Sequence, residues 1–116
     1  MFIQGESIPE FDFKGIKIRD YTVGLDLNAS LAVVEVAPGM GHKRALSTRS
    51  EKYYFVLEGR ISFWIGGEQK ILGPSDFCFV PRATDFSYAC HDQKVKMILI
   101  HAPAFDSNTE VFLEEK

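Results

Sequence analysis

Tyrosine, histidine and lysine side chains at strand-like positions are the groups in this sequence best suited to proton transfer. An imidazole titrates near neutral pH and can act as a general base, while a tyrosine or lysine can hold a proton at a fixed position. The candidates for these roles are His101, Tyr54 and Tyr88, with Lys52 two residues before Tyr54. Each also has a structural interpretation, as a hydrogen-bonded strand-end histidine, a core aromatic or a solvated lysine.

Lys52 is the most informative of these residues. It begins the segment "KYYFVLEG" (52–59), in which Lys52, Tyr54 and Val56 share one face of the expected strand. If that face is inward, the ammonium needs a carboxylate partner, a lowered pKa or an anionic ligand, because an unpaired buried charge is costly. If the strand begins later, Lys52 turns to solvent, where Glu51 can pair with it.

Metal-binding side chains are present, but their spacing matches no recognised arrangement. Divalent metals are held by imidazole, thiolate or carboxylate groups. The residues of these types near the candidate site are His42, Glu51, Cys78, Cys90 and His101. We therefore expect no metal and no other cofactor, and a rearranged site built from these donors is the open alternative.

The remaining polar and thiol groups are assigned more ordinary roles. His42 and His91 are expected to be exposed in a loop and a turn, and the two cysteines to be small buried hydrophobes. Four basic residues could form a rim that receives a carboxylate or phosphate, or could be solvated surface charges. They are Lys43, Arg44, Arg49 and Arg82.

The elements that would position these groups are short strands separated by glycine and proline. Apolar or alternating runs predict strands within 13–23, 30–41, 52–59, 60–72, 76–81, 85–92 and 95–103. The pair Gly66-Gly67 predicts the tip of a hairpin. Only the last residues, 108–116, have a trace of helical period. This pattern predicts one all-β domain over 1–116, a sandwich or a barrel, with a short C-terminal helix or tail.

Alternation along these strands predicts which side chains face the interior. The expected inward sets are Phe86, Tyr88 and Cys90 in one strand and Val95, Met97, Leu99 and His101 in another. In 52–57 both faces are largely apolar, because Tyr53, Phe55 and Leu57 oppose Tyr54 and Val56. One face is expected to line the interior and the other to meet a second sheet or a second copy of the chain.

Charge and composition argue against several classes of function. The net charge of -3 gives no general attraction to nucleic acid or to anionic membranes. No apolar stretch approaches membrane-spanning length, and the first residues lack the basic and apolar regions of a signal peptide. Two cysteines are too few for a typical secreted disulfide scaffold, so we expect a cytoplasmic protein.

The segment "EKYYFVLEGRISFWIGGEQKILGPSDFCFVPRAT" resembles the cupin family of small jelly-roll β-barrels. Two cupin motifs align with the chain, one on Gly59 and one on Pro81, and the matching region covers 30–105. In the family these motifs carry three histidines and a glutamate that bind a metal. The resemblance puts those positions at Leu46, Thr48, Phe86 and Lys52. A shorter spacing puts the first two at Ala45 and Ser47 instead.

The resemblance implies a cupin barrel. Because none of the motifs' ligand positions carries a histidine or a carboxylate, we expect a metal-independent barrel that binds a small polar or anionic organic molecule. The mixture of aromatic and polar side chains expected inside suits such a ligand. The expected ligand-binding residues are Leu46, Thr48, Lys52, Tyr54, Phe86, Tyr88 and His101.

Two other functions remain open. One is a metal-independent isomerase or epimerase acting on a sugar or another small carbonyl compound, with His101, Tyr54 and Tyr88 as the catalytic groups. The other is a structural or regulatory dimer with a filled barrel. The resemblance also implies a homodimer, formed through the face near Tyr53, Phe55 and Leu57 or through 13–23. The net charge leads us to expect no nucleic-acid or membrane partner.

Overall fold

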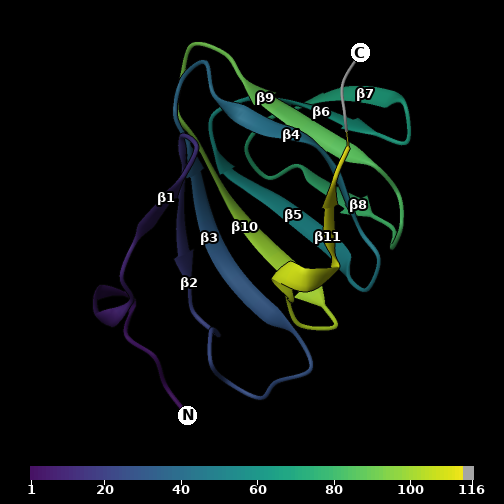
Figure 1. Cartoon of the computed structure of the whole chain (residues 1–116). Coiled ribbons are helices and arrows are strands. Elements are labelled where there is room, and N and C mark those ends of the chain that lie inside the picture. Colours follow the sequence, from purple (N-terminus) through teal and green to yellow (C-terminus); the bar gives the residue numbers. More distant parts are fainter. Residues whose placement is uncertain (114–116) are drawn as a thin grey trace.

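The structure is a computed structural model, and it describes residues 1–113. Two antiparallel sheets face each other across one interior (Figure 1). The larger sheet has the order β1 (Phe11–Phe13), β2 (Ile16–Asp20), β3 (Ser30–Val36), β10 (Val95–Ala102), β5 (Glu51–Glu58), β8 (Phe77–Val80). The smaller sheet has the order β11 (Glu110–Phe112), β4 (Gly41–Ser47), β9 (Phe86–Cys90), β6 (Ile61–Ile65), β7 (Glu68–Leu72). The all-β prediction is confirmed.

The apolar core lies between the two sheets and follows from the alternation of the sequence. In β3, "SLAVVEV", every second side chain is buried, because these residues alternate between the interior and the outer face. The strands β5, β9 and β10 alternate in the same way, with Tyr54, Phe86 and Met97 among the fully buried side chains. The inward sets predicted for β9 and β10 are therefore correct, and in β5 the inward face is the one that carries Lys52, Tyr54 and Val56.

Three predicted elements differ from the structure. The run 13–23 is divided by a turn at Lys14 and Gly15, both of which have positive φ, so that β1 and β2 form a hairpin. The run 30–41 ends as a strand at Val36. The expected C-terminal helix is absent over the described residues: a 3-10 turn, η2 (Ser107–Thr109), leads into β11, and residues 114–116 lie outside the described part.

The strand β4 was not predicted, although it is central to the smaller sheet. Its sequence "GHKRALS" has consecutive charged residues, and its pairing with β9 shifts register between His42 and Ala45. A register shift of this kind breaks the alternation from which strands are predicted.

Within residues 1–113 a second 3-10 turn, η1 (Gly5–Ser7), precedes β1. No helix in this part of the chain has the length and apolar character needed to cross a membrane.

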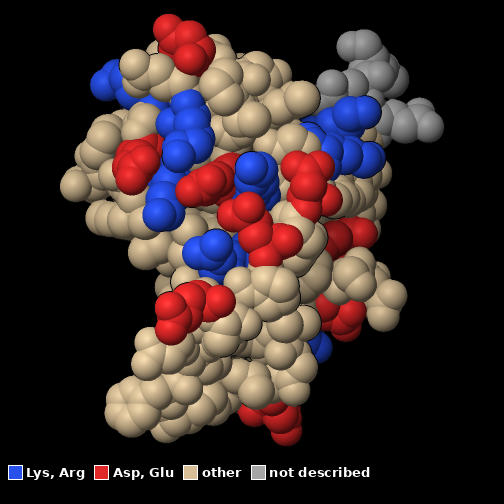
Figure 2. Space-filling model, turned by 90° about the vertical axis from the view of Figure 1, so that its left-hand side faces the viewer, with Lys and Arg blue, Asp and Glu red and all other residues tan. Residues whose placement is uncertain are grey.

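The outer face of the larger sheet carries alternating charges. Lys17, Glu35, Lys96 and Glu58 are neighbours in register across β2, β3, β10 and β5. Figure 2 shows basic and acidic side chains interspersed in a band across this side of the molecule. Opposite charges on adjacent strands stabilise the pairing of a solvated sheet face.

Candidate ligand-binding and active site

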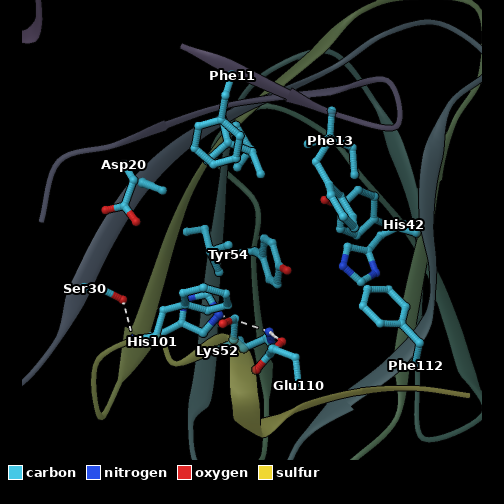
Figure 3. A pocket seen from close by; sticks show the side chains of 18 residues that line it. Phe11, Phe13, Asp20, Ser30, His42, Lys52, Tyr54, His101, Glu110 and Phe112 are labelled. Atoms are coloured by element: carbon cyan, nitrogen blue, oxygen red, sulfur yellow. Dashed lines mark hydrogen bonds and ion pairs between the residues drawn. The ribbon is translucent and has the colours of Figure 1, made fainter. Parts of the chain in front are cut away.

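A cavity of about 490 Å³ lies between the two sheets and is bordered by the first and last described strands, β1 and β11. Its wall is mainly apolar and comes from β1, β2, β3, β5 and β10 of the larger sheet and from β4, β9 and β11 of the smaller one. The polar residues of the lining are Asp20, Ser30, His42, Lys52, Tyr54, Tyr88, His101, Ser107 and Glu110. Figure 3 labels all of these except Tyr88 and Ser107.

Lys52, Glu110 and His101 form a hydrogen-bonded cluster at one end of the cavity. Lys52 and His101 are cross-strand partners on β5 and β10, which brings Lys52 Nζ within 3.0 Å of His101 Nε2. Lys52 Nζ also donates to Glu110 Oε1, at 2.5 Å. The ammonium lies 5.0 Å from the centre of the Phe86 ring, within cation–π range. The Lys52 side chain is 4% exposed and that of Glu110 is 11% exposed.

The cluster fixes the protonation state of His101. Burial, followed by the nearby Lys52 charge and then His42, lowers the pKa of His101 to about 3. Its imidazole is therefore neutral near pH 7, and Nε2 can accept the hydrogen bond from Lys52. Burial also lowers the pKa of Lys52, and the charge and hydrogen bond of Glu110 oppose that change. Lys52 thus faces inward, and Glu110 of the same chain is its carboxylate partner.

His42 borders the cavity from β4. Its Nδ1 lies 2.7 Å from the carbonyl oxygen of Lys43, which can only accept, so Nδ1 carries the proton. Burial lowers the pKa of His42, and the neutral ring then keeps a lone pair on Nε2. The ring stacks on Phe112, with 5.5 Å between ring centres and 13° between planes. His42 was expected to be exposed in a loop, and the structure corrects this.

Tyr54 and Tyr88 place two hydroxyl groups at the cavity wall. Their rings meet edge to face at 5.8 Å, and both rest against Phe63. Burial raises the pKa of both phenols, so each keeps its proton near neutral pH. Neither hydroxyl has a hydrogen-bond partner among residues 1–113. Both are therefore available to a ligand, and Tyr88 is the register partner of His42.

The structure brings together four of the seven residues expected to bind a ligand: Lys52, Tyr54, Tyr88 and His101. Phe86 is buried behind this group. Leu46 and Thr48 do not line the cavity: Leu46 pairs with Val111 of β11, and Thr48 is exposed. The inward positions of β4 are Ala45 and Ser47, as the shorter motif spacing had placed them.

Sequence reasoning missed Glu110 and the position of His42. Glu110 lies in a tail whose pattern favoured a helix, and its partner Lys52 is 58 residues away. The proposed basic rim is not part of the cavity, since none of its four residues lines the wall, and Arg44 pairs with Asp85 at 2.9 Å. His91 is exposed as expected, and both cysteines are free thiols, Cys90 buried and Cys78 partly so.

The positions that hold a metal in the cupin motifs are occupied here by side chains that do not suit one. Ala45 and Phe86 offer no donor, Ser47 accepts hydrogen bonds from two backbone N–H groups, and Lys52 adds a positive charge. Within the described residues no three histidine, cysteine, aspartate or glutamate side chains gather as ligands. These side chains do not fit a metal ion.

Solved structures of similar shape include enzymes. Pac13, described as a nucleoside dehydratase, is 26% identical with a TM-score of 0.86, over 98% of this chain and 91% of its own. A histidine-to-glutamine variant of Streptomyces PAC13 with uridine is 27% identical with a TM-score of 0.83, over 96% and 88%. Two tyrosine-to-phenylalanine variants with uridine are similar at 25% identity.

More distant structures share the fold alone. KdgF from Halomonas sp. is 17% identical with a TM-score of 0.83, over 93% of this chain and 97% of its own. No protein with a curated description matches the sequence. The family model described as "Cupin domain" matches residues 32–102. The predicted jelly-roll fold is thereby confirmed, and the chain belongs to the cupin family.

Proposed function

We propose that this chain binds an uncharged nucleoside, or a closely related sugar-containing molecule, and eliminates water from it without a metal ion. One observation carries the proposal. A neutral histidine, His42, borders the same cavity as the hydroxyls of Tyr54 and Tyr88, and within residues 1–113 neither hydroxyl nor His42 Nε2 has a hydrogen-bond partner. A base and two acids at the wall of one cavity are the groups that elimination requires.

The cavity suits a ligand of this kind in size and lining. Its volume of about 490 Å³ falls within the range of small-molecule sites. Aromatic rings at the mouth, among them Phe11, Phe13 and Phe112, offer flat apolar surfaces to a base or a sugar ring. Because this space is open, a barrel filled by side chains, which was one of the functions left open by the sequence, is disfavoured.

Elimination of water needs one proton removed and one delivered. His42 Nε2 would take a proton from a carbon of the substrate, and that electron pair would form the new carbon–carbon double bond. As the bond from the neighbouring carbon to its hydroxyl breaks, a tyrosine would supply the proton that makes the leaving group water. The raised pKa values of Tyr54 and Tyr88 keep these protons in place until then.

The similarity to Pac13 supports dehydration over isomerisation. That protein is a nucleoside dehydratase, and the variants solved with uridine replace a histidine or a tyrosine. These are the residue types that the present cavity offers at His42, Tyr54 and Tyr88. An isomerase could use the same base and acids, so the product distinguishes the two: elimination lowers the substrate mass by one water and isomerisation leaves it unchanged.

The proposal is tested by binding and by turnover. Calorimetry should detect binding of uridine. When nucleosides with and without a carbonyl group on the sugar are incubated with the protein, mass spectrometry should detect loss of water from at least one of these nucleosides. His42→Gln, Tyr54→Phe and Tyr88→Phe should lower turnover by about 10²–10⁴-fold where the replaced group transfers a proton. Tyr53→Phe, outside the cavity lining, is the matched control and should be neutral. Absence of nucleoside binding, or full turnover in all three variants, would disprove the proposal.

We also propose that two copies of the chain associate through the outer face of β5 and β8. Phe55 and Phe77 are register partners there, and they are 39% and 54% exposed. Phe79 and Leu57 extend the same apolar surface, at 38% exposed each. The strand β8 is also an edge strand, and a second copy that covers this face would remove both the apolar exposure and the open edge.

A further inference from the structure

We infer that Glu110 is the specificity-determining residue of the cavity, with one oxygen neutralising Lys52 and the other accepting a hydrogen bond from an uncharged ligand. The nucleoside as ligand rests on the proposed function, and the inference extends it. The site would accept a nucleoside through a hydroxyl or N–H group and would exclude the phosphate ester of the same nucleoside.

The first observation is an unused acceptor. Glu110 Oε1 is bound by Lys52 Nζ, whereas Glu110 Oε2 is buried and has no hydrogen-bond partner within residues 1–113. A carboxylate accepts through both oxygens, and a buried acceptor left without a partner costs free energy. Because Glu110 lines the cavity, a donor on a bound ligand can satisfy this oxygen.

The second observation is that Lys52 is already engaged. Two of its three N–H groups have partners, Glu110 Oε1 and His101 Nε2, and the ammonium lies over the Phe86 ring. From the sequence, an anionic ligand was one possible partner for an inward-facing Lys52. In the structure the carboxylate of Glu110 is that partner. An anion that approached the remaining N–H group would lie beside a carboxylate already held at 2.5 Å from the ammonium, and the two negative charges would repel each other.

The third observation is the sign of charge around the cavity. Among the described residues, Lys52 is the single lysine or arginine in the lining, which also includes the carboxylates of Asp20 and Glu110. His42 and His101 add no positive charge near neutral pH, because burial lowers both pKa values. A phosphate in the cavity would meet an excess of negative charge in surroundings of low polarity, where like charges repel strongly.

The β11 backbone holds Glu110 in this role. Glu110 pairs with Ser47 and Phe112 with Ala45, the two inward positions of β4, so Glu110 and Phe112 share the inward face of β11. Figure 3 shows Glu110 beside Lys52 at one end of the cavity, with Phe112 next to His42. Glu110, the residue proposed to select between ligands, therefore lies on a strand that is paired with β4.

Calorimetry on the full chain and on Glu110→Gln tests the inference with three probes: uridine, uridine 5′-monophosphate and inorganic phosphate. The unaltered protein should bind uridine and neither phosphate compound. The amide places an NH₂ group against the ligand donor and frees Lys52 from its counter-ion. Glu110→Gln should therefore bind uridine about tenfold to a hundredfold more weakly, the loss expected for a hydrogen bond to a charged group. It should also acquire binding of both phosphate compounds.

Two further variants serve as controls. Glu58→Gln makes the same change at an exposed position on β5 and should leave all three affinities unchanged. The double variant Lys52→Met with Glu110→Gln removes both charges, so that no unpaired lysine remains to oppose folding. The double variant should lose uridine affinity as Glu110→Gln does, and it should acquire no phosphate binding. If Glu110→Gln does not fold, the double variant still tests the inference.

The outcomes separate this inference from the proposed function. If the unaltered protein binds uridine and Glu110→Gln binds it equally well, the inference is wrong and the proposed function stands. Equal binding of uridine and its monophosphate by the unaltered protein also overturns the inference. If the unaltered protein binds no nucleoside while Glu110→Gln acquires phosphate binding, the proposed function fails and the role of Glu110 in excluding anions stands. Failure of both measurements overturns both.

Discussion

Burial sets the protonation states of the residues around the cavity. His42 and His101 are both held neutral, yet their free electron pairs have different uses: His101 Nε2 lies against Lys52, and His42 Nε2 is left for a ligand. The same physical cause raises the pKa of Tyr54 and Tyr88 and keeps them protonated. The proposed base and the proposed acids can thus coexist at one pH, because their surroundings lower the pKa of the histidine and raise those of the tyrosines.

Neutral burial of His101 should make the protein less stable in acid. Its pKa is about 3 in the folded chain, below its ordinary value of 6.5, so the unfolded chain binds the proton more readily between these values. Stability from this group is complete above about pH 6.5 and falls as the pH drops toward 3, by at most about 1.4 kcal/mol per pH unit.

Urea denaturation at several pH values checks this prediction. His101→Gln keeps an acceptor for Lys52 without a titrating group, so its free energy of unfolding should fall less steeply than that of the unaltered protein over this range. Gln69→Asn, at an exposed position, adds and removes no titrating group; it is the control and should leave the slope unchanged. Parallel pH profiles for the unaltered protein and His101→Gln would contradict the assignment.

At the scale of elements, the contact between β4 and β9 positions the candidate base. His42 follows Gly41, and Gly41 pairs with Ala89 just before the register shift in this pair of strands. A Cβ at Gly41 would lie 2.2 Å from the backbone oxygen of Tyr88. The strands approach this closely only because glycine has no side chain, and the approach carries His42 to Tyr88.

Gly41→Ala should separate β4 from β9 and displace His42. We expect a loss of about 1–3 kcal/mol in the free energy of unfolding, as for other overpacked sites, together with a marked loss of ligand binding. Gly24→Ala is the control, because its φ of +78° makes alanine strained while nothing lies within 4 Å of the added atom. It should lower stability without changing ligand affinity. Unchanged binding in Gly41→Ala would show that this close approach does not position the site.

The sequence was informative where local pattern determines structure. The strands β9 and β10 alternate well enough that Tyr88 and His101 could be predicted to face inward, whereas both faces of β5 are largely apolar and alternation alone did not assign Tyr54 to the interior. The strand β4 could not, because charged residues and a register shift conceal its alternation. The partner of Lys52 could not either, since Glu110 is 58 residues away on a strand of three residues that forms only by pairing with β4.

At the scale of the whole molecule, the outer face of the larger sheet has two regions of different character. Across β2, β3 and β10 the outer face carries paired opposite charges, whereas over β5 and β8 it is apolar. A solvated charged surface resists association, and an apolar surface at a sheet edge favours it. This contrast places the proposed dimer contact at β5 and β8.

Light scattering tests the proposed dimer. The chain should have the mass of two copies, and Phe77→Lys should lower it to that of one, because a charge at the centre of the contact opposes burial. Ile71→Lys is the matched control: Ile71 is 55% exposed, but it lies on β7 of the other sheet. A single-copy mass for the unaltered chain would contradict the proposal, as would equal effects of the two substitutions.

The cavity wall includes residues from both β1 and β11, which are the first and last described strands. A ligand that contacts residues of both strands binds the folded chain and not an unfolded one, in which these strands lie far apart. Its presence should therefore slow digestion of the protein by proteases, which cleave unfolded chains.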